Sequence, residues 1–146
     1  MSIHEINPDG AKILVVDDER HIARFLEFVL KKAGYEVALA YNGEQALAAA
    51  EAFDPDVVLL DLVLPGLPSL EVLKRLRADF GHAALAVMVM STQPFEELPA
   101  ELREAGANAH CTKPMAPSTL LKKLADLGVP PSIQGSGPIV TPGRGA

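Results

Sequence analysis

The chain has few of the features that mark secreted, membrane or nucleic-acid-binding proteins. Its single cysteine, Cys111, cannot form an internal disulfide, so the composition does not call for an oxidising compartment. The first residues form neither a basic leader nor an apolar run, so we expect no signal peptide. The longest apolar run, residues 83–90, is far shorter than the ~18 residues of a membrane span. We therefore expect a cytoplasmic protein without a membrane segment.

Positive charge is also scarce. The 146 residues contain 13 Lys and Arg against 19 Asp and Glu, which gives a formal net charge of -6. A phosphate backbone repels an acidic surface, and no local cluster of Lys or Arg offsets this, so we expect no direct nucleic-acid binding. Hydrophobic residues make up 49% of the chain, which is enough to bury the core of one domain without disulfides.

Both ends of the chain differ from its middle in composition. Residues 1–10 include the turn-prone sequence Asn-Pro-Asp-Gly. Residues 129–146 are rich in Pro, Gly and Ser and carry one charged side chain. This composition predicts an N-terminal extension at 1–10, a folded domain at 11–128, and a flexible tail or linker at 129–146.

The middle alternates short β-prone runs with segments of helical spacing. The expected strands are Lys12–Val16, Glu36–Ala40, Asp56–Leu60, Leu85–Met90 and Ala109–Cys111. The third and fourth runs are continuously apolar, as in strands that are covered on both faces. The alternation predicts an α/β fold in which a doubly wound, five-stranded parallel sheet lies between two layers of helices.

A helix is expected after each strand. In the first helix, apolar residues recur at helical spacing and are expected to be buried, Phe25 among them. The second helix begins at Asn42, and Gln45 completes a capping box. The third helix covers Ser69–Asp79. The fifth covers Pro117–Leu127. Leu47 in the second helix and Leu121 in the fifth are expected to point inward. The fourth is short, because a proline is tolerated only at a first helical position, so we expect it to begin near Leu98 or Pro99 and to end at Ala105.

Polar side chains follow four of the five strands at their carboxyl ends, where open parallel sheets bind ligands. They are Asp17 and Asp18, Asp61, Ser91 and Thr92, and Lys113. Carboxylates that meet on one rim repel each other unless a cation or a raised pKa relieves them. Oxygen ligands on loops favour a hard cation, and Mg²⁺ suits carboxylates that act together with water and a phosphate.

This set of side chains predicts a site for phosphoryl transfer. A carboxylate can attack phosphorus to form an aspartyl phosphate. The transition state spreads negative charge over three oxygens, which Mg²⁺, the Lys113 ammonium and the Ser91 hydroxyl could stabilise. One Asp after one strand is usually a loop residue or a helix cap, so the prediction rests on the combination.

In combination these motifs resemble the receiver domain of two-component response regulators. The resemblance covers residues 11–128 and rests on Lys12–Glu19, Val57–Asp61 followed by Pro65-Gly66, Ser91, and Gly106–Pro114. It implies a flavodoxin-like (βα)5 fold with strand order 2-1-3-4-5. It also implies a signalling switch that catalyses only its own phosphorylation and dephosphorylation.

The resemblance also implies roles for the site residues. Asp61 would accept a phosphoryl group from a phosphohistidine of a sensor histidine kinase or a histidine phosphotransfer protein. Asp18 and Asp61 would ligate Mg²⁺, with Asp17 acting mainly through water and Val63 through its backbone carbonyl. Lys113 would pair with the phosphoryl oxygens, beside a bond to Pro114 that is typically cis in the family.

The switch residues implied by the resemblance are Ser91, Thr92 and His110. Ser91 would move to hydrogen-bond the phosphoryl group, and the side chain of His110 would move inward with it. His110 stands where the family usually has Tyr or Phe, and Thr92 where a small residue is common. A protein partner would read the switch on the face formed by the fourth helix, fifth strand and fifth helix. We expect a stand-alone regulator or the receiver portion of a longer protein.

Three alternatives differ in the chemistry they need. The first is a pseudo-receiver, a binding module that is never phosphorylated, which the loss of an acid or of Lys113 would favour. The second is a phosphohydrolase of the haloacid-dehalogenase type. That type requires a second Asp two residues after the nucleophile, where this chain has Val63. The third is a flavodoxin-like flavin protein, whose phosphate Asp17 and Asp18 would repel.

Overall fold

The computed structural model describes residues 10–80 and 85–131, so most of the predicted N-terminal extension and tail lie outside these ranges. Within them, five parallel strands form one sheet in the order β2-β1-β3-β4-β5. The strands are β1 (Lys12–Val16), β2 (Glu36–Ala40), β3 (Val57–Asp61), β4 (Ala86–Ser91) and β5 (Ala109–Thr112). The predicted α/β fold and strand order are confirmed.

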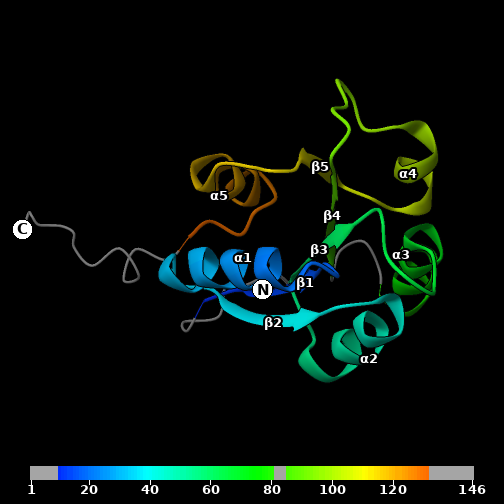
Figure 1. Cartoon of the computed structure of the whole chain (residues 1–146), viewed down its shortest axis with the longest axis horizontal. Helices are drawn as coiled ribbons and strands as arrows, with labels where there is room; N and C mark the ends of the chain where they lie inside the picture. Colours follow the sequence, from blue (N-terminus) through cyan, green and yellow to red (C-terminus); the bar gives the residue numbers. More distant parts are fainter. Residues whose placement is uncertain (1–9, 81–84, 132–146) are drawn as a thin grey trace, which may run out of the picture.

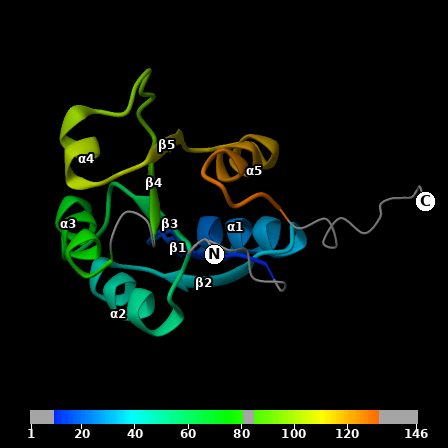
Figure 2. The same ribbon diagram turned by 180° about the vertical axis from the view of Figure 1, so that it is seen from behind.

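Helices cover both faces of the sheet, as Figures 1 and 2 show from opposite sides. They are α1 (Arg20–Lys32), α2 (Gly43–Phe53), α3 (Ser69–Asp79), α4 (Ala100–Ala105) and α5 (Pro117–Asp126). Helices α1 and α5 pack on one face, against Ile13 and Val15 of β1. Helices α2 and α3, with partly buried side chains of α4, pack on the other, against Leu14 and Val16. The alternation of side chains along a strand thus divides the core into two halves.

Two predicted strands are displaced by one residue, and the displacement matters for the site. The third ends at Asp61 and the fourth at Ser91, so both polar residues are the last residues of strands. Asp61 pairs in register with Met90, and Ser91 with Thr112. Because strand pairing holds their backbones, these side chains start from fixed positions at the rim.

Not all of the side chains predicted to be buried are buried in the structure. Phe25 is 49% exposed, because Ala23, Leu26 and Leu30 form the stripe of α1 that faces the sheet. Leu47 and Leu121 are only partly buried against the two halves of the core. The apolar spacing of α1 therefore predicts a wider buried face than the sheet covers.

The fourth helix is as short as predicted, but Pro99 is its N-cap and not its first residue. Gly106 ends it with a φ of 116°, and a Cβ there would clash with the side chain of Arg77. The guanidinium of Arg77 donates hydrogen bonds to the carbonyl oxygens of Gly106 and Leu85 and to the side chain of Asn108. Helix α3 thus holds the turn between α4 and β5. Burial lowers the pKa of Arg77, which remains a cation.

Buried residues lie just outside both predicted domain boundaries. Gly10 and Val129 are both buried. The hydroxyl of Tyr35 donates a hydrogen bond to the carbonyl oxygen of Val129, which holds the chain after α5 against the residues that follow α1. Desolvation by burial raises the pKa of Tyr35, so this hydroxyl stays protonated. None of the helices in the described ranges has the length and apolar character that crossing a bilayer requires.

Candidate functional site

The predicted acids meet at the carboxyl ends of β1 and β3, which are neighbours in the sheet. Asp17 is fully buried and Asp61 is 4% exposed, whereas Asp18 is exposed. Each of the three can place one carboxylate oxygen within 4.8 Å of the others. The structure therefore brings together the three acids that the sequence placed on one rim.

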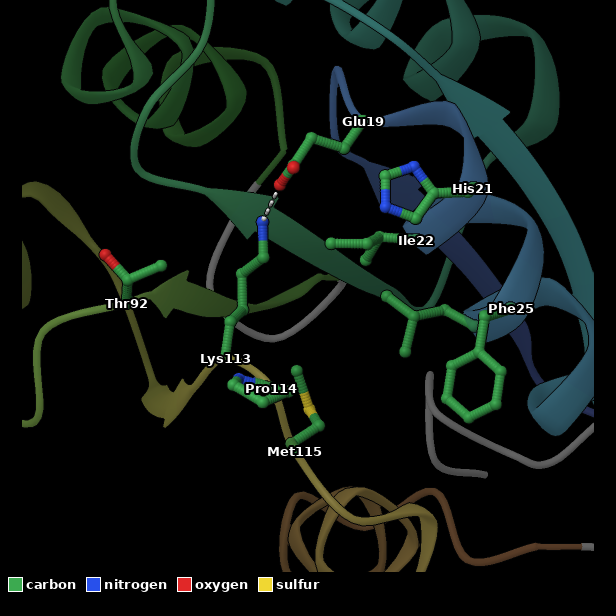
Figure 3. A pocket seen from close by; sticks show the side chains of 9 residues that line it. Glu19, His21, Ile22, Phe25, Thr92, Lys113, Pro114 and Met115 are labelled. Atoms are coloured by element: carbon green, nitrogen blue, oxygen red, sulfur yellow. Dashed lines mark hydrogen bonds and ion pairs between the residues drawn. The ribbon is translucent and has the colours of Figure 1, made fainter.

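Lys113, at the end of β5, supplies the positive charge of the site. Its Nζ lies 2.9 Å from Oδ2 of Asp17 and 3.2 Å from Oδ2 of Asp61, and the side chains of all three residues are buried. Its Nζ also lies 3.4 Å from Oε1 of Glu19, a half-exposed carboxylate that the sequence interpretation gave no role. Figure 3 shows Lys113 reaching from below toward Glu19. A buried ammonium of this kind is held only where carboxylates pair with it.

Backbone and hydroxyl groups orient the two buried carboxylates. The amide of Val63 donates to Oδ1 of Asp61 at 3.1 Å, and the amide of Glu19 donates to Oδ1 of Asp17 at 2.9 Å. The hydroxyl of Ser69 donates to the carbonyl oxygen of Asp61 at 2.6 Å. A serine at a helix start suggests an N-cap, so the sequence did not show that Ser69 holds the backbone of Asp61.

The charges of Asp61 and Lys113 depend on each other. Burial raises the pKa of Asp61, and this outweighs the Val63 amide and the Lys113 ammonium, which act in the opposite direction. Burial alone would lower the pKa of Lys113, but its hydrogen bond to Asp17 and the charge of Asp61 raise it overall. Lys113 is therefore fully charged at neutral pH, and its ammonium favours the ionised form of the desolvated Asp61 carboxyl.

Comparison with known proteins identifies the family of the chain. Residues 13–125 match the family described as the response regulator receiver domain. The chain belongs to this family. Receiver domains are signalling modules of two-component systems and not enzymes in the usual sense.

Individual relatives agree with this assignment. The alkaline phosphatase synthesis transcriptional regulatory protein PhoP of Bacillus subtilis (strain 168) is 42% identical over 106 residues, which are 73% of this chain and 43% of that protein. This chain thus spans less than half the length of that relative. Among solved structures, chemotaxis protein CheY4 of Vibrio cholerae is 33% identical with a TM-score of 0.75, over 80% of this chain and 98% of that one. A putative response regulator from Chloroflexus aurantiacus J-10-fl is also 33% identical, with a TM-score of 0.73 over 81% and 97% of the two chains.

Two predicted switch residues of this receiver domain lie at the end of β4. The buried Oγ of Ser91 accepts a hydrogen bond from the amide of Gln93 at 3.0 Å, which uses a lone pair and not the hydroxyl proton. The amide of Lys113 donates to the carbonyl oxygen of Ser91 at 2.7 Å and so ties β5 to β4 beside the site. Thr92 is exposed and lines, with Lys113 and Glu19, a cavity of about 490 Å³ (Figure 3). The bond between Lys113 and Pro114 is cis, as the family resemblance implied.

The third predicted switch residue, His110, is not part of this cluster of side chains. Its ring packs edge-on against Phe95 with centroids 5.5 Å apart, and it lines a second cavity of about 290 Å³ with Thr119 and Lys123. Its Nδ1 is buried and has no hydrogen-bond partner among the described residues. Burial, followed by the charge of Lys123, lowers the pKa of His110, so the ring is neutral at physiological pH.

The donor set fits Mg²⁺. Asp17, Asp18 and Asp61 offer only carboxylate oxygens, which are hard ligands, and two of these residues are buried and need a compensating positive charge. Each of the two buried carboxylates has its Oδ1 oriented by a backbone amide. The family and the chemistry of these side chains therefore agree on a divalent cation at this rim.

Proposed function

We propose that this receiver domain takes a phosphoryl group onto Asp61 from a histidine kinase or a histidine phosphotransfer protein and then signals to a protein partner. The observation that carries the proposal is the buried contact of Lys113 Nζ with both Asp17 and Asp61. A buried nucleophilic carboxylate, a buried ammonium and a second acid are what phosphoryl transfer at one rim needs. The pseudo-receiver alternative is disfavoured, because every charged group of the site is present.

In the transfer step, a carboxylate oxygen of Asp61 forms a bond to phosphorus. The bond between phosphorus and the imidazole nitrogen of the donor breaks, and its electron pair stays on that nitrogen. The Val63 amide holds one Asp61 oxygen in place, and the Lys113 ammonium lies where it can pair with phosphoryl oxygens. Mg²⁺, when held by Asp17, Asp18, Asp61 and the carbonyl of Val63, would neutralise the charge that gathers on those oxygens.

The signal would leave through β4 and β5. The contact with the Gln93 amide leaves the hydroxyl proton of Ser91 unused, so Ser91 can donate that proton to a phosphoryl oxygen. Thr92 would border the bound phosphoryl group, and His110 would turn inward from Phe95. The face of α4, β5 and α5 would then change shape for the partner.

We also propose that the domain acts in the cytoplasm and does not bind nucleic acid itself. The net charge of -6 supports the second part of this proposal, because a phosphate backbone repels an acidic protein. The relative named as a transcriptional regulatory protein is matched over only 43% of its length, so its name says little about nucleic-acid binding by this part.

Intact-mass measurement after incubation with acetyl phosphate and Mg²⁺ tests the proposal. Wild type should gain the mass of one phosphoryl group, EDTA should prevent the gain, and Asp61→Asn should abolish it. Asp79→Asn, at the exposed end of α3, is the matched control and should behave as wild type. A wild type that gains no mass, or an Asp61→Asn variant that gains it equally, would contradict the proposal.

A further inference from the structure

We propose that Glu19 is a positioning residue, which takes hold of the Lys113 ammonium when Mg²⁺ claims Asp17 and Asp61. The inference rests on the proposed function and adds a residue to it. Lys113 Nζ has three carboxylate neighbours, at 2.9 Å in Asp17, 3.2 Å in Asp61 and 3.4 Å in Glu19. Of these three carboxylates, those of Asp17 and Asp61 can also ligate a metal ion.

Mg²⁺ and the Lys113 ammonium compete for the carboxylates of Asp17 and Asp61. Both belong to the group of three acids whose oxygens can surround one metal ion, and both are in contact with Lys113. A divalent ion that binds them must weaken their contacts with the ammonium. Because only 7% of the Lys113 side chain is exposed, an ammonium that loses these partners without replacement would carry a large desolvation cost.

Glu19 offers the replacement. It is already in contact with Nζ, and it lies outside the group of acids that can share a metal ion. Half of its side chain is exposed, so it loses little hydration by taking a larger share of the ammonium. Glu19 and Lys113 also line the same cavity of about 490 Å³, and their charged ends face each other there (Figure 3).

Among the described residues, the carboxylate of Glu19 makes no contact that would compete with its ion pair to Lys113. Glu19 is the N-cap of α1, yet its side chain makes no capping hydrogen bond. Its backbone amide, not its carboxylate, donates to Asp17. The ion pair with Lys113 is therefore the contact that explains a long acidic side chain where Ser, Thr, Asp or Asn would cap the helix better.

Calorimetric titration of the purified protein with Mg²⁺ tests the proposal. We expect Glu19→Gln to weaken Mg²⁺ binding about threefold, the scale of one half-exposed ion pair. Glu19→Asp keeps the charge at the start of α1 but shortens the side chain, and it should weaken binding about as much. An Asp variant that binds Mg²⁺ like wild type would show that only the local charge matters, and would overturn the proposal.

A double-mutant cycle with Lys113→Met shows whether Glu19 acts through the ammonium. In that background the effect of Glu19→Gln on Mg²⁺ affinity should disappear, because there is no ammonium left to reposition. Glu44→Gln is the control for loss of one negative charge at the same rim, since the Glu44 carboxylate lies beside Gly66. It should change Mg²⁺ affinity less than Glu19→Gln. An undiminished effect of Glu19→Gln without Lys113 would refute the proposal.

The rate of phosphorylation by acetyl phosphate gives a second readout. Glu19→Gln should slow the reaction at low Mg²⁺ and approach the wild-type rate when Mg²⁺ is saturating. A defect that persists at saturating Mg²⁺ would contradict a positioning role. Failure of the proposed function looks different, because then wild type itself would bind no Mg²⁺ or gain no phosphoryl group.

Discussion

The centre of the sheet and its β5 edge are built differently. All residues of β3 are buried, and its last residue, Asp61, is held by the Val63 amide, the Ser69 hydroxyl and Lys113. At the edge, β5 has one buried residue in four, and α4 has none among its six, all within the described range. The α4 region is held largely by Arg77 and by half-buried leucines.

This difference matches the two tasks that the proposed function would combine in one domain. A phosphoryl acceptor must hold charged groups within tenths of an ångström, which a packed centre provides. A reporter must adopt a second arrangement at small energetic cost, which a lightly packed helix provides.

Removing the same side chain from each region should show the division most clearly. Leu60→Ala opens a cavity in fully buried β3 and should cost about 3 kcal/mol, within the range for buried leucines. Leu102→Ala removes a half-buried contact of α4 and should cost about 1 kcal/mol. Urea unfolding followed by circular dichroism measures both. Equal losses would show that α4 is packed as firmly as the centre.

Shortening the Arg77 clamp should loosen the edge alone. Arg77→Lys keeps a positive charge but cannot reach Gly106, Leu85 and Asn108 together, and should cost about 2 kcal/mol. Amide hydrogen exchange should accelerate in α4 and β5 and stay unchanged in β1 and β3. Faster exchange throughout the sheet would contradict a local role.

Removing the Ser91 hydroxyl should leave phosphorylation of Asp61 intact and weaken the conformational response to it. Ser91→Ala loses the Oγ contact with Gln93, which is worth about 1 kcal/mol at most, and leaves Asp61 and Lys113 untouched. The variant should gain a phosphoryl group but show a reduced change in the NMR spectrum of α4 and β5. A full NMR response in this variant would refute the role given to Ser91.

The pH dependence of stability should carry a small contribution from His110. Its pKa in the folded protein is lowered, so the unfolded chain binds more protons when the pH falls below about 6.5. The stabilising contribution is complete above the unfolded pKa and is lost as the pH falls through the folded one. In His110→Phe the free energy of unfolding should fall less steeply as the pH is lowered from about 8 to about 5.5. A steeper decline in the variant would contradict the assignment.

What the sequence predicted and what it missed have physical reasons. The fold and the meeting of Asp17, Asp61 and Lys113 were predictable, because parallel strands place their carboxyl ends on one edge. The contact of Glu19 with Lys113 was not, since it depends on side-chain reach across two loops. The exposure of Phe25 was missed for a related reason: periodicity gives the direction of an apolar face but not the width that the sheet can cover.

The bond between Tyr35 and Val129 determines how a mechanical load would travel through the domain. A pull applied to the chain at Pro131 first meets Val129, whose carbonyl is held by Tyr35 and whose side chain is buried. Tyr35 follows the far end of α1, a helix of 13 residues, or about 20 Å, whose other end begins beside the acids. A pull applied after Pro131 therefore acts on the last turn of α5 and, through Tyr35, on the end of α1 that is remote from Asp61.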